Sequence, residues 1–356
     1  MTDRYRHTIP ATGLLSATMG RRALLKGTGL AVAGSMMGGL FGRSAFAQTA
    51  DEALVAAAKA EGRLVLYTGS AEPLIISLAE AFKAEYGIQL EYQRLNSSDV
   101  ASRYTAEAEA GKTIADVVMA GDPLLLEAFR AKGWLADLDP ALVPGLADWP
   151  EQFRNDFSAV ISINPQTMAV NTQLVAEPPT SWSDMLRPEF KGRMITQDLR
   201  SVGLVAFGAY DLLLREYGED FLRDLGKQDF QLGSGGPASI QQVAAGAASL
   251  FFPCSTTQAY SMIDQGAPVA AVIPENEPCT GVLTPVAVSQ NAQNPNAARL
   301  FSGFLLSQTG QVLLNAQTIS PNSSPGTAPL PTYFVEPDME SAEENQQKII
   351  ELMGLA

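Results

Sequence analysis

One stretch of this sequence, residues 62–122, restricts the possible folds more than any other. Three short apolar runs alternate there with two segments in which apolar residues recur at helical spacing, in the order 63–70, 72–86, 87–92, 98–110 and 114–119. Strands that alternate with helices in this way form mostly parallel sheets with helices packed on their faces. The stretch therefore predicts an open α/β sheet.

Each of these three expected strands ends in a short turn of polar or small residues. Ligands of open α/β sheets bind beyond the carboxyl ends of the strands. The turn residues are therefore candidate ligand contacts: Thr68, Gly69, Ser70, Ser97, Ser98, Gly121 and Asp122.

The second half of the chain repeats the plan of strand, turn and helix. Its turns add a further set of candidate contacts: Arg200, Ser201, Val202, Gly203, Ser255, Thr256 and Thr257, with a glycine-rich turn at 234–236 between them. The chain is expected to cross between two lobes near Asn171 and to return near 279–284. Two lobes joined in this way can open and close on a hinge.

The N-terminal segment has the features of an export signal. Arg21 and Arg22 precede an apolar stretch at 27–41, and Ala45-Phe46-Ala47 has the small residues of a cleavage site. A basic amphipathic start or a membrane anchor is the alternative, but the apolar run is short and rich in glycine. The segment resembles a twin-arginine signal peptide cleaved after Ala47, which implies export to a bacterial periplasm.

Composition excludes several classes of function. The chain has 24 basic and 38 acidic residues, a net charge of −14, which argues against non-specific nucleic-acid binding. Without residues 1–47, it has 18 basic and 37 acidic residues, a net −19. The single histidine, His7, lies in that segment, so histidine triads and histidine zinc sites are excluded from the mature chain. An enzyme that uses carboxylates alone, such as Asp116 and Asp122, remains an alternative.

Several stretches together resemble the periplasmic solute-binding proteins of bacterial ABC importers, in the group that contains ferric-ion, thiamine and phosphonate binders. The stretches that carry this resemblance are 64–69, 115–118, 121–122, 182–192, 265–269, 295–298, 304–307 and 310–311. The resemblance implies a type II α/β fold of two lobes joined by a two-strand hinge, with a ligand cleft between the lobes. The implied division is 48–168 for the first lobe, 169–280 for the second, and 281–356 for the return to the first lobe and the C-terminal helices.

The resemblance also implies that the chain binds a small molecule and delivers it to an ABC permease in the inner membrane. We expect a monomer without a cofactor or nucleic acid. Serine and threonine hydroxyls at helix N-termini favour an anion, and Arg200 can add a bidentate contact. Asp122 can receive an ammonium group. We therefore expect a small organic anion or zwitterion, with a phosphonate-like compound favoured.

A ferric ion is the alternative ligand within the same family. Ferric binders of this group carry adjacent tyrosines where this chain has Thr256 and Thr257, so this chain departs from their pattern. Asp122 and Tyr260 are the oxygen ligands that remain for iron.

The two cysteines, Cys254 and Cys279, are 25 positions apart. In an exported protein this arrangement favours a disulfide, which would contribute about 3 kcal/mol through loop closure. Two buried thiols are the alternative, because the twin-arginine route exports chains that have already folded.

Overall fold

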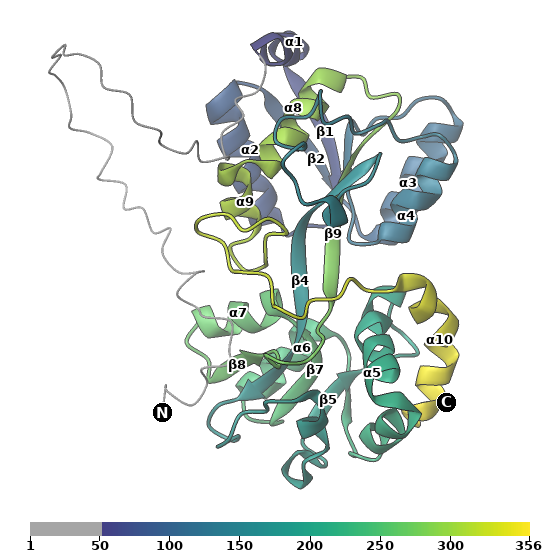
Figure 1. Cartoon of the computed structure of the whole chain (residues 1–356), viewed down its shortest axis with the longest axis vertical. Helices are drawn as coiled ribbons and strands as arrows, with labels where there is room; N and C mark the ends of the chain where they lie inside the picture. The colour runs from purple at the N-terminus through teal and green to yellow at the C-terminus, as the bar shows by residue number, and fades with distance from the viewer. Residues whose placement is uncertain (1–51) are drawn as a thin grey trace, which may run out of the picture.

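The structure, a computed structural model, describes residues 52–356 and shows two lobes built on one continuous nine-stranded sheet. The strand order is β2-β1-β3-β9-β4-β7-β5-β6, and β8 pairs with β4 beside this path. The two lobes lie one above the other in Figure 1, with β4 and β9 running between them. The expected two-lobed α/β architecture is therefore confirmed.

The first lobe is a five-stranded part of the sheet with helices on both faces. β1, β2 and β3 run parallel, and β9 and the first half of β4 complete it, β9 being antiparallel to its neighbours. One face packs against α1, α2, α8 and α9, and the other against α3 and α4. The bounds are α1 Glu52–Glu61, β1 Arg63–Thr68, α2 Glu72–Tyr86, β2 Gln89–Arg94, α3 Ser97–Glu109, β3 Val117–Met119, α4 Pro123–Ala131, η2 Glu151–Phe153, β4 Ser158–Asn171, β9 Gly281–Val288, α8 Pro295–Leu306 and α9 Gln308–Leu314.

The second lobe has the same layered plan. β5, β6 and β7 run parallel, and the second half of β4 lies antiparallel between β7 and β8. One face packs against α5 and α10, and the other against α6 and α7. The bounds are η3 Trp182–Leu186, η4 Pro188–Phe190, β5 Met194–Gln197, η5 Leu204–Ala206, α5 Phe207–Gly226, β6 Gln231–Gly233, α6 Gly236–Ala244, β7 Leu250–Ser255, α7 Thr256–Asp264, β8 Val269–Val272 and α10 Met339–Leu352.

Local sequence explains how α2 begins and ends and how α3 begins. Pro73 occupies the first turn of α2, where its missing N–H costs no hydrogen bond. Gly87 ends the helix at φ 75°, and its N–H donates to the Lys83 carbonyl at 2.8 Å. Asn96 caps α3, since its side-chain oxygen accepts from the Asp99 N–H at 2.9 Å.

Strand directions bring the carboxyl ends of both sets of parallel strands toward the region between the lobes. β4 runs from the first lobe into the second and points the same way as β1, β2 and β3, because β9 is antiparallel to both β3 and β4. β7 is antiparallel to β4, so β5, β6 and β7 point back toward the first lobe. The turns that follow these six strands therefore face one another across the hinge.

The hinge forms where β4 changes its strand partner. Residues 158–165 of β4 pair with β9, and from Gln166 onward the strand pairs with β7. Gly281 is required at this crossing, because a Cβ there would lie 2.8 Å from both the Asn164 carbonyl oxygen and the Pro165 Cα.

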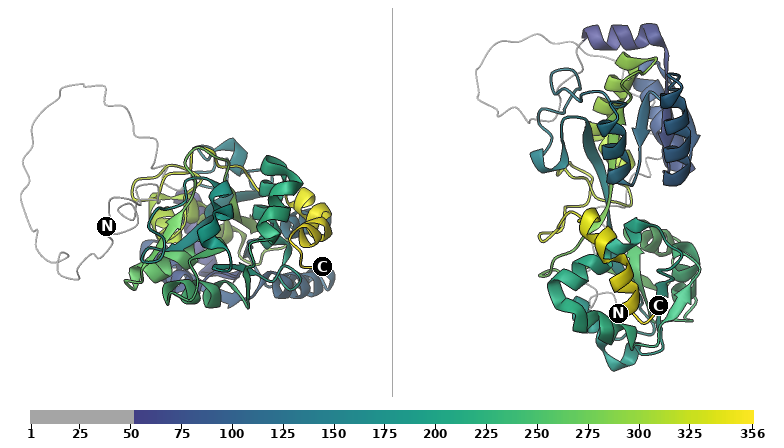
Figure 2. Two further views of the ribbon diagram at one scale, coloured as in Figure 1. Left: turned by 90° about the horizontal axis from the view of Figure 1, so that it is seen from below. Right: turned by 90° about the vertical axis from the view of Figure 1, so that its right-hand side faces the viewer.

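A third segment runs beside the two hinge strands, which the expectation of a two-strand hinge did not include. Residues 315–338 leave α9 in the first lobe and lead to α10, which packs on α5 in the second (Figure 1, and Figure 2, right). Ile319 exchanges backbone hydrogen bonds with Ile163 of β4, and Cys279 accepts one from the Val335 N–H. This segment is rich in proline and serine, so its sequence carries no strand pattern. The lobe boundaries expected from the sequence stay predictions.

Candidate functional site

The turn after β1 is held by its own hydroxyl groups. Thr68 is fully buried, and its Oγ1 accepts from the Ser70 N–H at 3.1 Å and bonds the Ser70 hydroxyl at 3.0 Å. Gly69 packs closely on the next turn, since a Cβ there would lie 3.2 Å from the Leu95 carbonyl oxygen. Thr68 and Gly69 therefore shape the turn, and Ser70 is its partly exposed hydroxyl.

The start of α3 lies beside that turn. Ser97 and Ser98 are both exposed in its first turn. A further residue at this turn, not among the predicted contacts, is Arg94, the last residue of β2, whose Nε donates to the Ser70 carbonyl at 3.1 Å. Its Nη1 and Nη2 atoms make no hydrogen bond to another residue of the described chain, 52–356. Its position at a strand end is the one signal in the sequence that could have identified it.

Asp122 differs from the other predicted contacts in the hydrogen bonding of its side chain. It stands at the N-cap of α4, yet its side chain makes no cap hydrogen bond. Its Oδ1 atom is buried and has no hydrogen-bond partner among residues 52–356. A carboxylate oxygen can only accept hydrogen bonds, so this atom is free to accept one from a water molecule or a ligand. The preceding residue, Gly121, lines a small pocket at the hinge.

Asp116 does not form a catalytic pair with Asp122. The alternative of an enzyme that uses these two carboxylates therefore loses its support. The two residues stand at opposite ends of β3. Asp116 is fully buried, and its carboxylate accepts from the Val65 N–H and from the N–H and side-chain amide of Asn294, each at 2.9 Å. These bonds join β1 to the start of α8, which is a structural role.

Arg200 is already paired in the second lobe. Its Nε and Nη2 bond the Asp198 carboxylate at 2.8 and 2.9 Å, and the Arg200 side chain is 52% exposed. The same arginine lowers the pKa of Asp198, chiefly through the side-chain hydrogen bonds. Ser201 donates to the Asp198 carbonyl, so the whole turn is organised around this aspartate. Of the other predicted contacts in this turn, Val202 packs against the second-lobe core and Gly203 begins η5.

The hydroxyls at the start of α7 are also engaged. The Thr256 hydroxyl donates to Asn164 Oδ1 at 2.9 Å and to the Gln317 carbonyl at 3.2 Å. The Thr257 hydroxyl accepts from the Asn164 amide at 3.0 Å and lies 3.1 Å from the Ser255 hydroxyl. These three predicted contacts therefore lie together beside the hinge, where they fix α7 to β4.

A small pocket lies between the lobes at the hinge. Gly121 of the first lobe contributes to its wall, and the start of α5 contributes from the second lobe. The residues that line it are Gly121, Gln166, Val205, Gly208, Ala209, Thr280, Gly281, Val282, Leu283, Pro337 and Met339.

The oxygen ligands needed for iron are poorly represented. Tyr260 is 4% exposed, and burial raises its pKa, which disfavours the phenolate form that Fe³⁺ prefers. Within residues 52–356 no group of three or more histidine, cysteine or acidic side chains is placed to hold a metal ion.

The predicted disulfide between Cys254 and Cys279 is wrong, since both are free, buried thiols. Cys254 belongs to the hydrophobic cluster under α6 and α7, and Cys279 to the cluster under α5 and α10. They therefore lie on opposite faces of the second-lobe sheet, which a disulfide cannot bridge.

Both thiols are expected to react slowly with an aromatic disulfide reagent at pH 8. Burial raises the pKa of Cys279 to about 12 and raises that of Cys254 as well, so little thiolate forms. Unfolding in guanidinium should release two thiols per chain. Release of none would show that the disulfide exists after all.

The predicted signal peptide at 1–47, with Arg21 and Arg22, lies outside the described residues. Among the helices of residues 52–356, none is both long and apolar enough to cross a membrane.

Comparisons with known proteins identify one family and one relative of similar length. A family model described as bacterial extracellular solute-binding protein matches residues 68–312. An uncharacterised protein of Haemophilus influenzae is 28% identical over 281 residues, which cover 73% of this chain and 78% of the relative.

Solved structures share the fold at low sequence identity. The substrate-binding protein of an ABC transporter from Agrobacterium tumefaciens is 20% identical at a TM-score of 0.67, covering 82% of this chain and 94% of its own. Iron-bound HitA from Pseudomonas aeruginosa is 20% identical at 0.63, covering 82% and 98%. AfuA from Actinobacillus pleuropneumoniae, with fructose-6-phosphate bound, is 22% identical at 0.63, covering 83% and 100%.

Proposed function

The chain belongs to the bacterial extracellular solute-binding protein family and has the type II periplasmic-binding-protein fold, and from this premise we propose that it captures a small organic anion or zwitterion for an ABC importer. A phosphonate-like compound is the favoured ligand. The solute binds in the cleft between the lobes and is handed to the permease in the inner membrane. The mature protein acts in the periplasm, as a monomer, after export by the twin-arginine route.

The unpaired acceptor at Asp122 carries this proposal. Its Oδ1 is buried without a hydrogen-bond partner among residues 52–356, at a turn that faces the region between the lobes. Burying an ionised oxygen without a donor is costly, so a ligand that supplies an ammonium or hydroxyl group gains from bonding it.

The anionic end of the ligand is assigned to the turns after β1 and β2. Ser70, Ser97 and Ser98 offer hydroxyls there, α3 begins beside them, and the Arg94 guanidinium lies over the Ser70 carbonyl. Arg94 replaces Arg200 in this role, because Asp198 already occupies the Arg200 guanidinium.

Strand spacing sets the size of the ligand. Arg94, Thr68 and Met119 stand side by side on β2, β1 and β3, so two strand spacings separate Arg94 from Met119. That separation is about 10 Å, and Asp122 follows three residues after Met119. Because the Arg94 side chain reaches the Ser70 carbonyl beyond β1, it covers part of this distance, and a small zwitterion or phosphorylated compound can contact both ends.

A ferric ion is the second candidate, favoured by one observation, which is that the similar HitA structure is iron-bound. The buried Tyr260 and the threonines at 256–257 weigh against it. The two ligands are separated by the screen that follows.

A thermal-melt screen of residues 48–356, unfolded and refolded to remove carried ligand, tests the proposal. The panel holds aminophosphonates, phosphate esters, carboxylates, polyamines, thiamine and ferric citrate. A ligand at a thousand times its Kd stabilises the native state by about 4 kcal/mol. We expect a large shift with an organic anion. A shift with ferric citrate alone would establish the iron alternative.

A further inference from the structure

The hinge pocket contains polar groups that the proposed ligand contacts do not use. Thr280 is 3% exposed, and its Oγ1 has no hydrogen-bond partner among residues 52–356. Gln166 lies beside it on β4, and its backbone N–H donates to the Thr280 carbonyl at 2.9 Å. The Gln166 side-chain amide makes no hydrogen bond to another residue of 52–356.

Thr280 and Gln166 both line small pockets at the hinge. Thr280 and Gln166 contribute to the pocket that Gly121 lines, and also to a second small pocket behind it that reaches Trp182 and Phe252. Each space admits a group about the size of one water molecule. The pocket therefore suits the tip of a ligand rather than the whole ligand.

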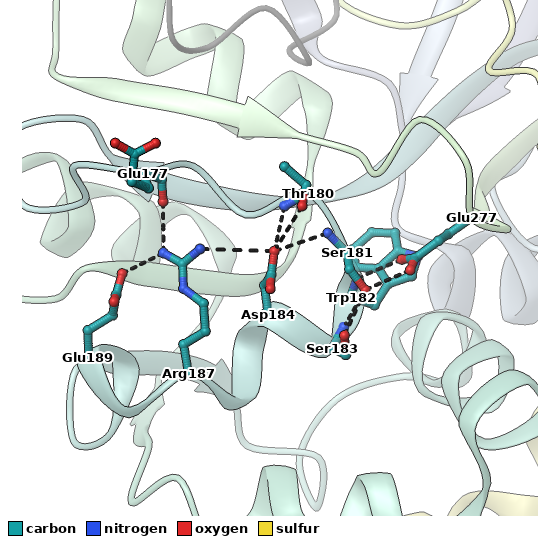
Figure 3. A network of polar contacts seen from close by, with 9 residues as sticks. All are labelled: Glu177, Thr180, Ser181, Trp182, Ser183, Asp184, Arg187, Glu189 and Glu277. Atoms are coloured by element: carbon teal, nitrogen blue, oxygen red, sulfur yellow. Dashed lines mark hydrogen bonds and ion pairs between the residues drawn. The ribbon is translucent and has the colours of Figure 1, made fainter.

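The segment that carries Thr280 is held in place by the contacts in Figure 3. Glu277 accepts from the Ser181 hydroxyl at 2.6 Å and from the Trp182 N–H at 2.7 Å. The Trp182 indole N–H donates to the Pro278 carbonyl at 2.8 Å. On the other side, Gly281 lies directly against β4. The Thr280 hydroxyl is therefore presented from a rigid backbone, as a selective contact requires.

The chemistry of the lining indicates what this pocket accepts. Its residues carry no charged side chain, and its polar groups are the Thr280 hydroxyl and the Gln166 amide, which both donate and accept. The unpaired acceptor oxygen of Asp122 belongs to the turn that borders it. A hydroxyl or amino group can bond these partners, whereas a methyl group would leave the Thr280 hydroxyl unsatisfied.

We propose that the hinge pocket at Thr280 and Gln166 binds a terminal hydroxyl or amino group of the captured solute and selects for solutes that carry one. This inference rests on the proposed function and adds the residues that form hydrogen bonds with the uncharged or ammonium end of the ligand. A site built to hydrogen-bond such a group rejects analogues that lack it.

A set of matched ligands and variants tests this selection. The probes are ethylphosphonate, 2-hydroxyethylphosphonate and 2-aminoethylphosphonate, with propionate, 3-hydroxypropionate and β-alanine as the carboxylate series. Binding is measured by calorimetry for the refolded chain and for Thr280→Val, which keeps the side-chain shape and removes the hydroxyl. Thr167→Val is the control, since Thr167 Oγ1 is equally buried and unpaired but Thr167 does not line the pocket.

The hydroxylated or aminated member of a series should bind at least about tenfold more tightly than the unsubstituted member. Thr280→Val should reduce this ratio clearly without weakening the unsubstituted member, although Asp122 keeps part of the preference for the aminated member, and Thr167→Val should leave the ratio intact. Equal binding of all members, or a ratio that Thr280→Val leaves unchanged, overturns the inference while the proposed function stands. Failure of every anion to bind overturns both.

A crystal structure supplies a second readout, for which the natural ligand need not be identified. The ligand-free protein should show an ordered water on Thr280 Oγ1, and a complex with any binder should show a ligand atom in its place. Density that shows no water in the free protein, or the same water retained in the complex, contradicts the inference.

Discussion

Replacing Asp122 with asparagine is expected to weaken solute binding about 10- to 100-fold. The carboxylate oxygen that lacks a partner in the described chain becomes part of a neutral amide, so the ligand loses a charge-assisted hydrogen bond worth about 1.5–3 kcal/mol. Asparagine is also a good N-cap residue, so α4 should still begin at the same position. Calorimetric titration of residues 48–356 with the strongest ligand of the panel measures the effect.

Asp139→Asn provides the matched control for this experiment. Asp139 is an aspartate of the same lobe that accepts a hydrogen bond from the Ala141 N–H at 2.8 Å, and it lies in the loop before β4, away from the strand ends. Its replacement should leave affinity unchanged. Equal affinity of Asp122→Asn and the unmodified chain would remove Asp122 from the site and with it the observation on which the proposed function rests.

Replacing Asp116 with alanine is expected to lower the free energy of unfolding by about 3–5 kcal/mol. The change leaves the N–H groups of Val65 and Asn294 and the Asn294 amide without their acceptor in a buried setting. Each buried donor left unpaired costs about 1–3 kcal/mol, and part of this is recovered because the charge no longer has to be buried. Urea unfolding measures the loss, and the slope of the unfolding free energy against urea concentration should be unchanged.

Asp148→Ala is the control for stability, since Asp148 is exposed in a loop of the first lobe and should change stability by less than about 0.5 kcal/mol. A small effect of Asp116→Ala would mean that Asp116 is not a structural carboxylate. The exported carboxylate enzyme would then return as an alternative.

The stretch at 62–122 shows how far the sequence alone could lead. The helix expected at 72–86 has these bounds in the structure. Pro73 favours the first turn of a helix, and Gly87 adopts the left-handed conformation that ends it. The helix α5 of the second lobe shows the limit, because its backbone kinks at Gly218, where φ 80° and ψ 179° are not helical, and a second helical segment follows. This second segment packs in the same hydrophobic cluster as α10, a tertiary contact that the local sequence does not specify.

The turns that make up the candidate site can be located from the sequence, whereas the contacts of their side chains cannot. Strand ends could be located from apolar runs, and topology brings them together. Which hydroxyls remain without a partner depends on residues that are distant in the sequence. Asn164, for example, accepts a hydrogen bond from the Thr256 hydroxyl, 92 positions later. The ion pair between Arg200 and Asp198 could not be predicted from the sequence. Thr280 could not be singled out either, because a threonine before a strand has no distinguishing pattern.

A calorimetric titration of the refolded chain 48–356 with the best organic anion of the panel, followed by mass spectrometry of the recovered ligand, tests solute capture most directly. We expect saturable binding of one ligand per chain, a ligand of unchanged mass, and loss of affinity in Asp122→Asn. Binding confined to ferric citrate, or recovery of a chemically altered ligand, would contradict it.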